Sequence, residues 1–112
     1  MDTRNYTYQQ LKTILSYLGR SYRISKRRIA IISENNKVEE NHRVYDDDNQ
    51  YVRIIDNALK ACSNNTQIII KHDYLYEAEP YWYRKYYARS SYYRYKRKAV
   101  EEFLNHLEEI NV

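Results

Sequence analysis

With 112 residues, of which 43% are apolar, the chain has the size of one ordinary domain and enough apolar side chains for one compact core. A single Gly and a single Pro argue against a turn-rich β architecture, and the lone cysteine, Cys62, excludes an internal disulfide. The first residues resemble neither a signal peptide nor a membrane span. We therefore expect one all-α domain over residues 1–112, with about five to six helices, that is cytoplasmic and has no membrane contact.

The charges are segregated along the sequence, although the formal net charge is only +4. Residues 84–98 carry seven Lys or Arg and no acidic residue, and residues 20–28 carry five Lys or Arg. Acidic residues gather instead in the middle of the chain, at 34–48, and near its end, at 101–109. A molecule polarised in this way is attracted to polyanions, so the charge pattern favours nucleic acid as a partner.

The first third of the chain predicts two helices separated by Gly19. Apolar residues recur at offsets of three and four over residues 8–18, which predicts a helix that stops at Gly19. A second helix over residues 22–33 would bury isoleucines and leave its basic residues in solvent. Residues 34–47 are polar without a clear period, and they predict the longest loop of the chain.

The clearest amphipathic pattern follows this loop. Apolar residues recur at offsets of three and four from Val52 to Cys62, the spacing of one helix face. The Asp-Asp-Asn run at 47–49 just before them is well suited to cap the helix N-terminus. Acidic residues on one short run could imitate a metal site, but no histidine partner lies nearby, so we expect a cap.

Residues 63–66 predict a turn, and either Asn65 or Thr66 would cap a further helix over residues 67–76. The three consecutive isoleucines at 68–70 also fit a buried strand, because a short apolar run does not distinguish a helix from a strand. No second convincing strand is present to pair with it. We therefore expect a helix in this segment.

The C-terminal third predicts a helix-turn-helix segment over residues 80–110. Pro80 suits the first turn of a short helix that ends near Tyr87, and a turn at 88–90 leads into a long helix from about Ser90 to Ile110. Residues spaced by three and four would form the core face of this long helix: Tyr92, Tyr95, Ala99, Phe103, Leu107 and Ile110.

The opposite face of the long helix would present polar and basic side chains near its N-terminal end. The candidates for reading base edges in the major groove are Ser90, Tyr93, Arg94, Arg97 and Lys98. The candidates for contacting the phosphate backbone are Arg84, Lys85, Arg89, Ser91 and Lys96. The acidic half of the helix, from Glu101 onward, would lie away from DNA because phosphates repel carboxylates.

The segment YWYRKYYARSSYYRYKRKAVEEFLNHL, residues 81–107, resembles the C-terminal end of small phage-type transcriptional regulators, the RinA and ArpU families. The residues that carry the resemblance are Ser91, Tyr92, Tyr93, Arg94, Lys96, Arg97, Lys98 and Ala99. It extends more weakly upstream through IIIKHDYL at 68–75, and so covers roughly the C-terminal half. The resemblance implies a helix-turn-helix like that of sigma-factor region four, promoter-proximal DNA binding and contact with RNA polymerase. Where these families have a capping Ser this chain has Ala88, so the helix would begin at Ala88 or at Ser90.

Together these observations predict a sequence-specific DNA-binding transcriptional regulator of phage type. One alternative is an RNA-binding protein, because exposed Tyr and Arg stack on unpaired bases. Another is a protein-interaction adaptor that grips RNA polymerase without reading DNA. The basic run at 20–28 fits either a second backbone-contacting surface or a solvated helix face. The sequence leaves open whether the chain forms a homodimer, because no heptad pattern indicates a dimer interface.

Catalysis and metal binding are not indicated by the sequence. The sequence shows no nucleophile, general base and orienting residue in the arrangement of a known catalytic motif. A single glycine cannot form a phosphate-cradling loop. His42, His72 and His106 are scattered, and with one cysteine they lack the spacing of a zinc motif. We therefore expect no enzyme activity, no cofactor and no metal.

Overall fold

The computed structural model describes residues 3–110, and every regular element in this range is helical. The α-helices are α1 (Tyr8–Glu34), α2 (His42–Lys60), α3 (Asn64–Ile70) and α4 (Arg89–Ile110). Three short segments complete the fold: a 3-10 turn at Thr3–Asn5, a π-helix at Lys71–Leu75 and a 3-10 helix at Trp82–Lys85. The predicted all-α class is confirmed over the described residues. None of their helices is both long and apolar enough to cross a membrane.

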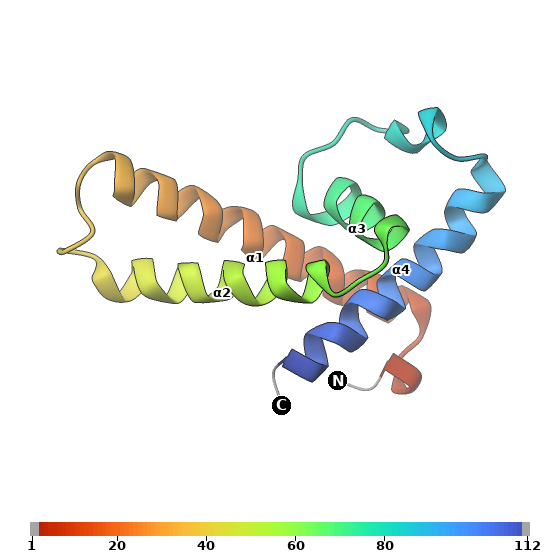
Figure 1. Ribbon diagram of the computed structural model, residues 1–112, viewed down its shortest axis with the longest axis horizontal. Coiled ribbons are helices and arrows are strands. Elements are labelled where there is room, and N and C mark those ends of the chain that lie inside the picture. The colour runs from red at the N-terminus through yellow and green to blue at the C-terminus, as the bar shows by residue number, and fades with distance from the viewer. Residues whose placement is uncertain (1–2, 111–112) are drawn as a thin grey trace.

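α1 and α2 form a long antiparallel pair of helices that runs along the longest axis of the molecule (Figure 1). The predicted helix end at Gly19 is wrong, because α1 runs through this position without a break. Gly19 is buried against the end of the π-helix, where a Cβ atom would lie 2.9 Å from the carbonyl carbon of Tyr74 and closer still to its oxygen. The glycine therefore permits a close approach of two segments and does not terminate the helix.

The connection between α1 and α2 is shorter than the predicted loop over 34–47, because α2 already begins at His42. The predicted cap at 47–49 is also wrong, since these residues lie inside α2. Asp48 is buried there, and its carboxylate accepts hydrogen bonds from Ser25 at 3.0 Å and from the Arg28 guanidinium at 2.7 Å. This polar contact, and not a cap, explains the buried acidic residue between α1 and α2.

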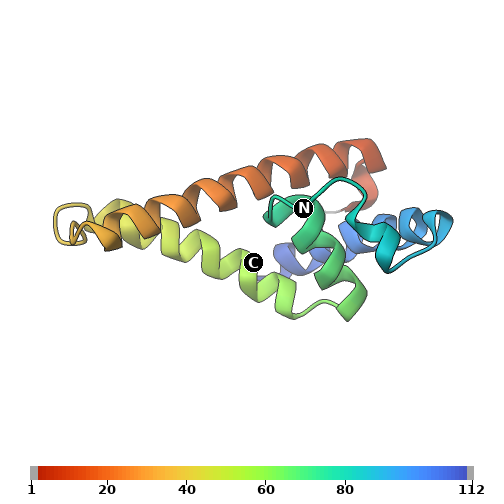
Figure 2. The ribbon, with the colours of Figure 1, turned by 90° about the horizontal axis from the view of Figure 1, so that it is seen from above.

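α3 and α4 gather at one end of the α1–α2 pair, while the other end projects freely (Figure 2). The predicted helix over 67–76 is found as α3 followed by the π-helix, although α3 starts earlier, after Ser63. Most of the core lies where these elements meet. Its largest fully buried side chains are Leu11, Leu15, Ile55, Ile69, Ile70, Leu75, Val100, Phe103 and Leu104.

The segment before α4 differs from the predicted helix between Pro80 and Tyr87. Only Trp82–Lys85 is helical, in the tighter 3-10 form, and it follows Tyr81 in the left-handed region with φ 62°. The expected α-helix is thus replaced by a single tight turn. α4 then begins at Arg89, and the Ala88 carbonyl accepts the Tyr92 amide at 2.9 Å, which places the start of the helix at the earlier of the two expected positions.

Candidate nucleic-acid interface

All five predicted base-reading residues are exposed on the first turns of α4. Offsets of three and four place Ser90, Arg94 and Arg97 on one side of the helix, flanked by Tyr93 and Lys98. We call these five residues the α4 strip. It lies at the end of the molecule opposite the free end of the α1–α2 pair (Figures 1 and 2).

The opposite face of α4 is buried as its spacing predicted. Tyr92, Ala99, Phe103 and Leu107 lie in the core and Tyr95 is half-buried, while the side chain of Ile110 lies outside the described part of the structure. A helix whose one face is anchored in this way presents its other face in a defined orientation. The α4 strip is therefore held by packing and not by its own charges.

The arginine heads of the α4 strip make only weak contacts with their neighbours. The Arg94 guanidinium lies 5.3 Å from the centre of the Tyr95 ring. Arg97 lies 5.4 Å from the Tyr8 ring, and its Nε is 3.8 Å from Glu101. The Arg97 side chain is 65% exposed and that of Glu101 46%, so the pair contributes little and is easily exchanged for another anion.

The predicted phosphate contacts divide into two groups. Arg84, Lys85 and Arg89 are exposed next to the start of α4, and Arg84 stacks over Tyr81 at 4.1 Å, whereas Ser91 is half-buried. Lys96 is different, because its side chain is 20% exposed and its ammonium lies 3.3 Å from the Asp73 carboxylate. Lys96 is thus committed to an internal ion pair and is poorly placed for a phosphate.

Asp73, which the sequence analysis did not single out, ties the π-helix to the start of α4. Its carboxylate accepts the indole N–H of Trp82 at 2.7 Å and the hydroxyl of Tyr92, in addition to the Lys96 pair. Burial raises the pKa of Tyr92, and the bond to Asp73 raises it further. The sequence predicts Tyr92 as a core residue of α4, but only the approach of residues 73 and 92 in space reveals its contact with Asp73.

Stacked aromatic rings connect the residues bound to Asp73 with the α4 strip. Tyr83 and Tyr92 stack with ring centres 3.8 Å apart and planes 4° from parallel, and Trp82 stacks on His72 at 4.1 Å. A hydrogen bond with Tyr93 raises the pKa of Tyr83. The aromatic residues before α4 therefore fix the short 3-10 helix against the first turns of α4.

The basic run at 20–28 lies on α1 and is partly used inside the protein. Arg23 donates a hydrogen bond to the Tyr74 carbonyl, and Arg28 binds Asp48. Lys26 and Arg27 are exposed. They help to line a hollow of about 360 Å³ between α1 and the end of the π-helix, whose lining residues are Tyr22, Arg23, Lys26, Arg27, Leu75, Tyr76 and Glu77.

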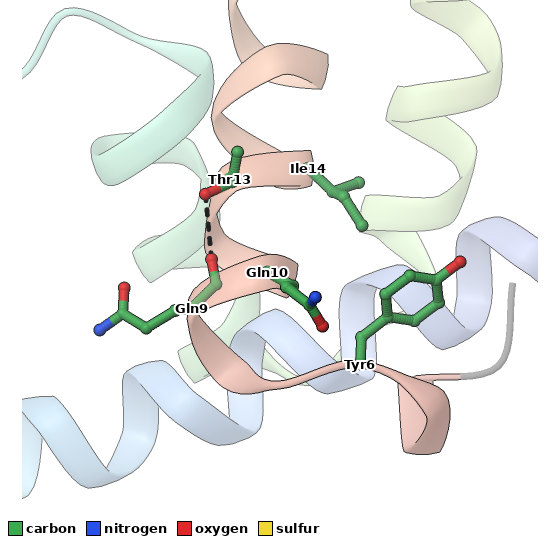
Figure 3. Close-up of a pocket in the computed structure, with 5 residues that line it drawn as sticks. All are labelled: Tyr6, Gln9, Gln10, Thr13 and Ile14. Atoms are coloured by element: carbon green, nitrogen blue, oxygen red, sulfur yellow. Dashed lines mark hydrogen bonds between the residues drawn. The ribbon is translucent and has the colours of Figure 1, made fainter.

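The outward side of α1 carries exposed apolar side chains, among them Ile24 and Ile31, so the prediction that the helix over 22–33 buries its isoleucines is wrong at these two positions. Tyr17, Ile24 and Ile31 recur every seven residues and are 72%, 40% and 51% exposed. Near the start of the same helix lies an open hollow of about 400 Å³ (Figure 3), lined by Tyr6, Gln9, Gln10, Thr13 and Ile14. Its lining offers amides, hydroxyls and apolar carbon but no carboxylate or imidazole, so it lacks the groups for acid–base catalysis.

No protein-family model, curated protein or solved structure matches this chain. The resemblance of its C-terminal half to the RinA and ArpU regulators therefore stays a prediction from the sequence.

Proposed function

We propose that this protein is a sequence-specific DNA-binding transcriptional regulator of phage type that inserts the first turns of α4 into the major groove. The observation that carries the proposal is the α4 strip, in which two arginines, a lysine, a tyrosine and a serine share one exposed face of a helix anchored in the core. Arginine donates two parallel hydrogen bonds to guanine, which is the commonest specific contact in the major groove.

The surroundings of the α4 strip support a groove-binding role. Arg84, Lys85 and Arg89 flank the start of the helix, where side chains would meet the phosphates on either side of a groove. Further along α4, Glu101 ends the basic stretch and would keep the second half of the helix away from the phosphates. Charge thus orients the helix with its N-terminal end toward DNA.

In this proposal, other elements of the fold support α4 in place of the first helix of a helix-turn-helix. The segment 80–110 has one 3-10 turn where the motif has its first helix, and α4 packs mainly against α3 and α2, while the π-helix adds the contacts of Asp73. Asp73 and the stacked Tyr83 hold the first turns of α4 against this platform. A recognition helix needs such support because base reading requires donors held in register with the base edges.

The test is a binding selection on a random duplex pool at about 0.15 M salt with excess competitor DNA, followed by sequencing of the retained fragments. Salt is held at this strength because non-specific phosphate binding falls steeply as salt rises. A shared motif is expected, and its symmetry would show whether the binding unit is a dimer. Retention without a motif would reduce the protein to a backbone binder, and no retention would overturn the proposal. A parallel competition with single-stranded RNA separates the RNA-binding alternative.

A second candidate function is that of a protein-interaction adaptor, and the outward side of α1 favours it. Tyr17, Ile24 and Ile31 form an exposed stripe, and exposed apolar stripes of this kind mark protein contacts. Purified RNA polymerase is the partner to test, because the sequence resemblance implies it. The double variant Ile24→Ser, Ile31→Ser should then abolish capture, whereas Arg94→Glu with Arg97→Glu should leave it unchanged. Capture that survives the first variant would exclude this surface.

A further inference from the structure

Three metal-ligating side chains converge where α2 ends beside α4. Cys62 directly follows Ala61, the C-cap of α2, while Glu102 and His106 lie one turn apart on α4. One ligand atom from each of the three side chains lies within 4.8 Å of the other two. Cys62 is buried, and Glu102 and His106 are half-buried, so the group lies at the edge of the core.

We propose that Cys62, Glu102 and His106 bind a divalent metal ion of the zinc type. A thiolate, an imidazole and a carboxylate are the three protein donors that Zn²⁺ accepts, and three protein ligands leave a fourth tetrahedral position for water. The sulfur and nitrogen donors disfavour Mg²⁺ and Ca²⁺, which take oxygen ligands. This inference is independent of DNA binding.

The groups around the three side chains are arranged as they are around protein metal ligands. His106 Nδ1 lies 3.3 Å from the Glu109 carboxylate, a contact that orients the ring and leaves Nε2 for an ion. A ligating histidine characteristically gives its other nitrogen to such a carboxylate, which makes the ring a better donor. The pair on α4 thus supplies an imidazole in the tautomer that metal binding requires.

The Glu102 carboxylate is fixed in place and still has room for an ion. It accepts the Ser63 amide at 2.7 Å on Oε1, and on Oε2 the Ser63 hydroxyl at 3.0 Å and the Thr66 hydroxyl at 2.5 Å. A carboxylate offers about four acceptor positions, so these three bonds leave one on Oε1. Hydrogen bonds of this kind orient a ligating carboxylate without displacing it.

The Cys62 thiol is buried at the end of α2, where it donates a hydrogen bond to the Ala58 carbonyl at 3.3 Å. An ion would replace this proton, and each bound ion would release one. The ion would then join the end of α2, the start of α3 through Glu102, and the second half of α4.

Cobalt provides the direct test, because Co²⁺ occupies zinc sites and reports its ligands by absorption. The chain of 112 residues, first freed of metal with a chelator, is titrated with Co²⁺ and then with Zn²⁺. We expect a thiolate-to-cobalt charge-transfer band and the visible bands of tetrahedral cobalt at one ion per chain, both removed by Zn²⁺. We also expect Zn²⁺ to raise the midpoint of thermal unfolding, since the ion binds only the folded chain.

Variants decide whether these three residues are the ligands. Cys62→Ser should remove the charge-transfer band, and His106→Gln should weaken Zn²⁺ binding at least about tenfold while circular dichroism shows an intact fold. His42→Gln, an exposed histidine on α2, is the matched control and should change neither readout. The proposal is overturned if folded protein gives no charge-transfer band in excess Co²⁺, or if His106→Gln binds Zn²⁺ as tightly as the unchanged chain.

Discussion

Two basic runs of this chain look alike in sequence and differ in structure. In the run at 20–28, Arg23 and Arg28 are bound to internal acceptors, one on the π-helix and one on α2. In the run at 84–98, which the structure describes throughout, Lys96 is the one cation with a half-buried ion pair, and its partner is Asp73. The first run therefore serves partly to hold α1 to its neighbours, through two of its five cations, while most of the second remains available to an anionic partner.

The difference follows from how much of each helix is covered. α1 passes between α2 and the π-helix, so cations on two of its sides meet a carboxylate or a free carbonyl within the protein. The first turns of α4 are covered on one side only, and cations on the other side meet solvent. A charge run in a sequence thus reports the number of cations but not how many of them the fold uses.

The largest effect is expected where the first run meets the π-helix. Gly19→Ala would drive a methyl group into the Tyr74 carbonyl and disturb the Arg23 contact with the same oxygen. The free energy of unfolding should fall by about 3 kcal/mol, measured by urea denaturation. At an unobstructed position inside a helix, Gly→Ala raises the free energy of unfolding by up to about 1 kcal/mol. A decrease at position 19 would therefore show that the close approach of Tyr74 requires the glycine. Ser16→Ala, an exposed position on α1, is the control and should have almost no effect.

The next effect tests whether the second run reads DNA. Arg94→Ala should weaken binding to the preferred duplex by about 1 to 3 kcal/mol and relax one base position, because an arginine bidentate to guanine would be lost. Fluorescence anisotropy on matched and mismatched duplexes measures both changes. Arg27→Ala, an exposed arginine of the first run, should change affinity less than about twofold. Equal losses on every sequence would make Arg94 a phosphate contact instead.

A smaller effect concerns the Arg28–Asp48 contact in acid. The hydrogen bond from Arg28 lowers the pKa of Asp48, burial opposes this change and the Ser25 hydroxyl adds to it, and the net direction is downward. The contact therefore stabilises the fold above the ordinary aspartate pKa of about 4 and is lost as pH falls below it. Asp48→Asn should reduce the free energy of unfolding at pH 7 by about 1 kcal/mol and flatten its decline in acid.

A control separates this carboxylate from others that act in the same direction. Burial would raise the pKa of Glu102, but hydrogen bonds from Thr66 and Ser63 lower it overall, so some loss of stability in acid should persist in Asp48→Asn. Asp47→Asn, an exposed neighbour on α2, should leave the pH profile unchanged. An unaltered profile for Asp48→Asn as well would contradict the role assigned to this contact.

The smallest effect distinguishes two lysines only two positions apart on α4. Lys98→Gln should reduce the slope of the logarithm of the DNA-binding constant against that of salt concentration by about 1, because one cation that displaces counterions from the DNA would be lost. Lys96→Gln should leave this slope unchanged, because Lys96 is paired with Asp73. Equal slopes for the two variants would show that Lys96 leaves its internal partner to bind DNA.

Apolar spacing alone predicted the parts of the fold that depend on neighbours along the chain. The face from Val52 to Leu59 on α2, continued by Cys62 just after it, and the face from Tyr92 to Leu107 on α4 are buried or half-buried where their period placed them. The exposed positions of the α4 strip follow from the same period, because burying one side of a helix determines which side faces solvent. The sequence thus determined the helical class and the composition of the candidate DNA-binding surface.

Tertiary structure alone decided features that depend on residues far apart in the chain. Gly19 resembles a helix end until the Tyr74 carbonyl lies against it, and Asp48 resembles a cap until α1 brings Arg28 to it. Cys62 and His106 lack a zinc spacing in the sequence but meet where α2 and α4 cross. The physical reason is the same each time: a local pattern records propensity and periodicity, whereas a carbonyl, charge or ligand set is completed by whichever segment packs beside it.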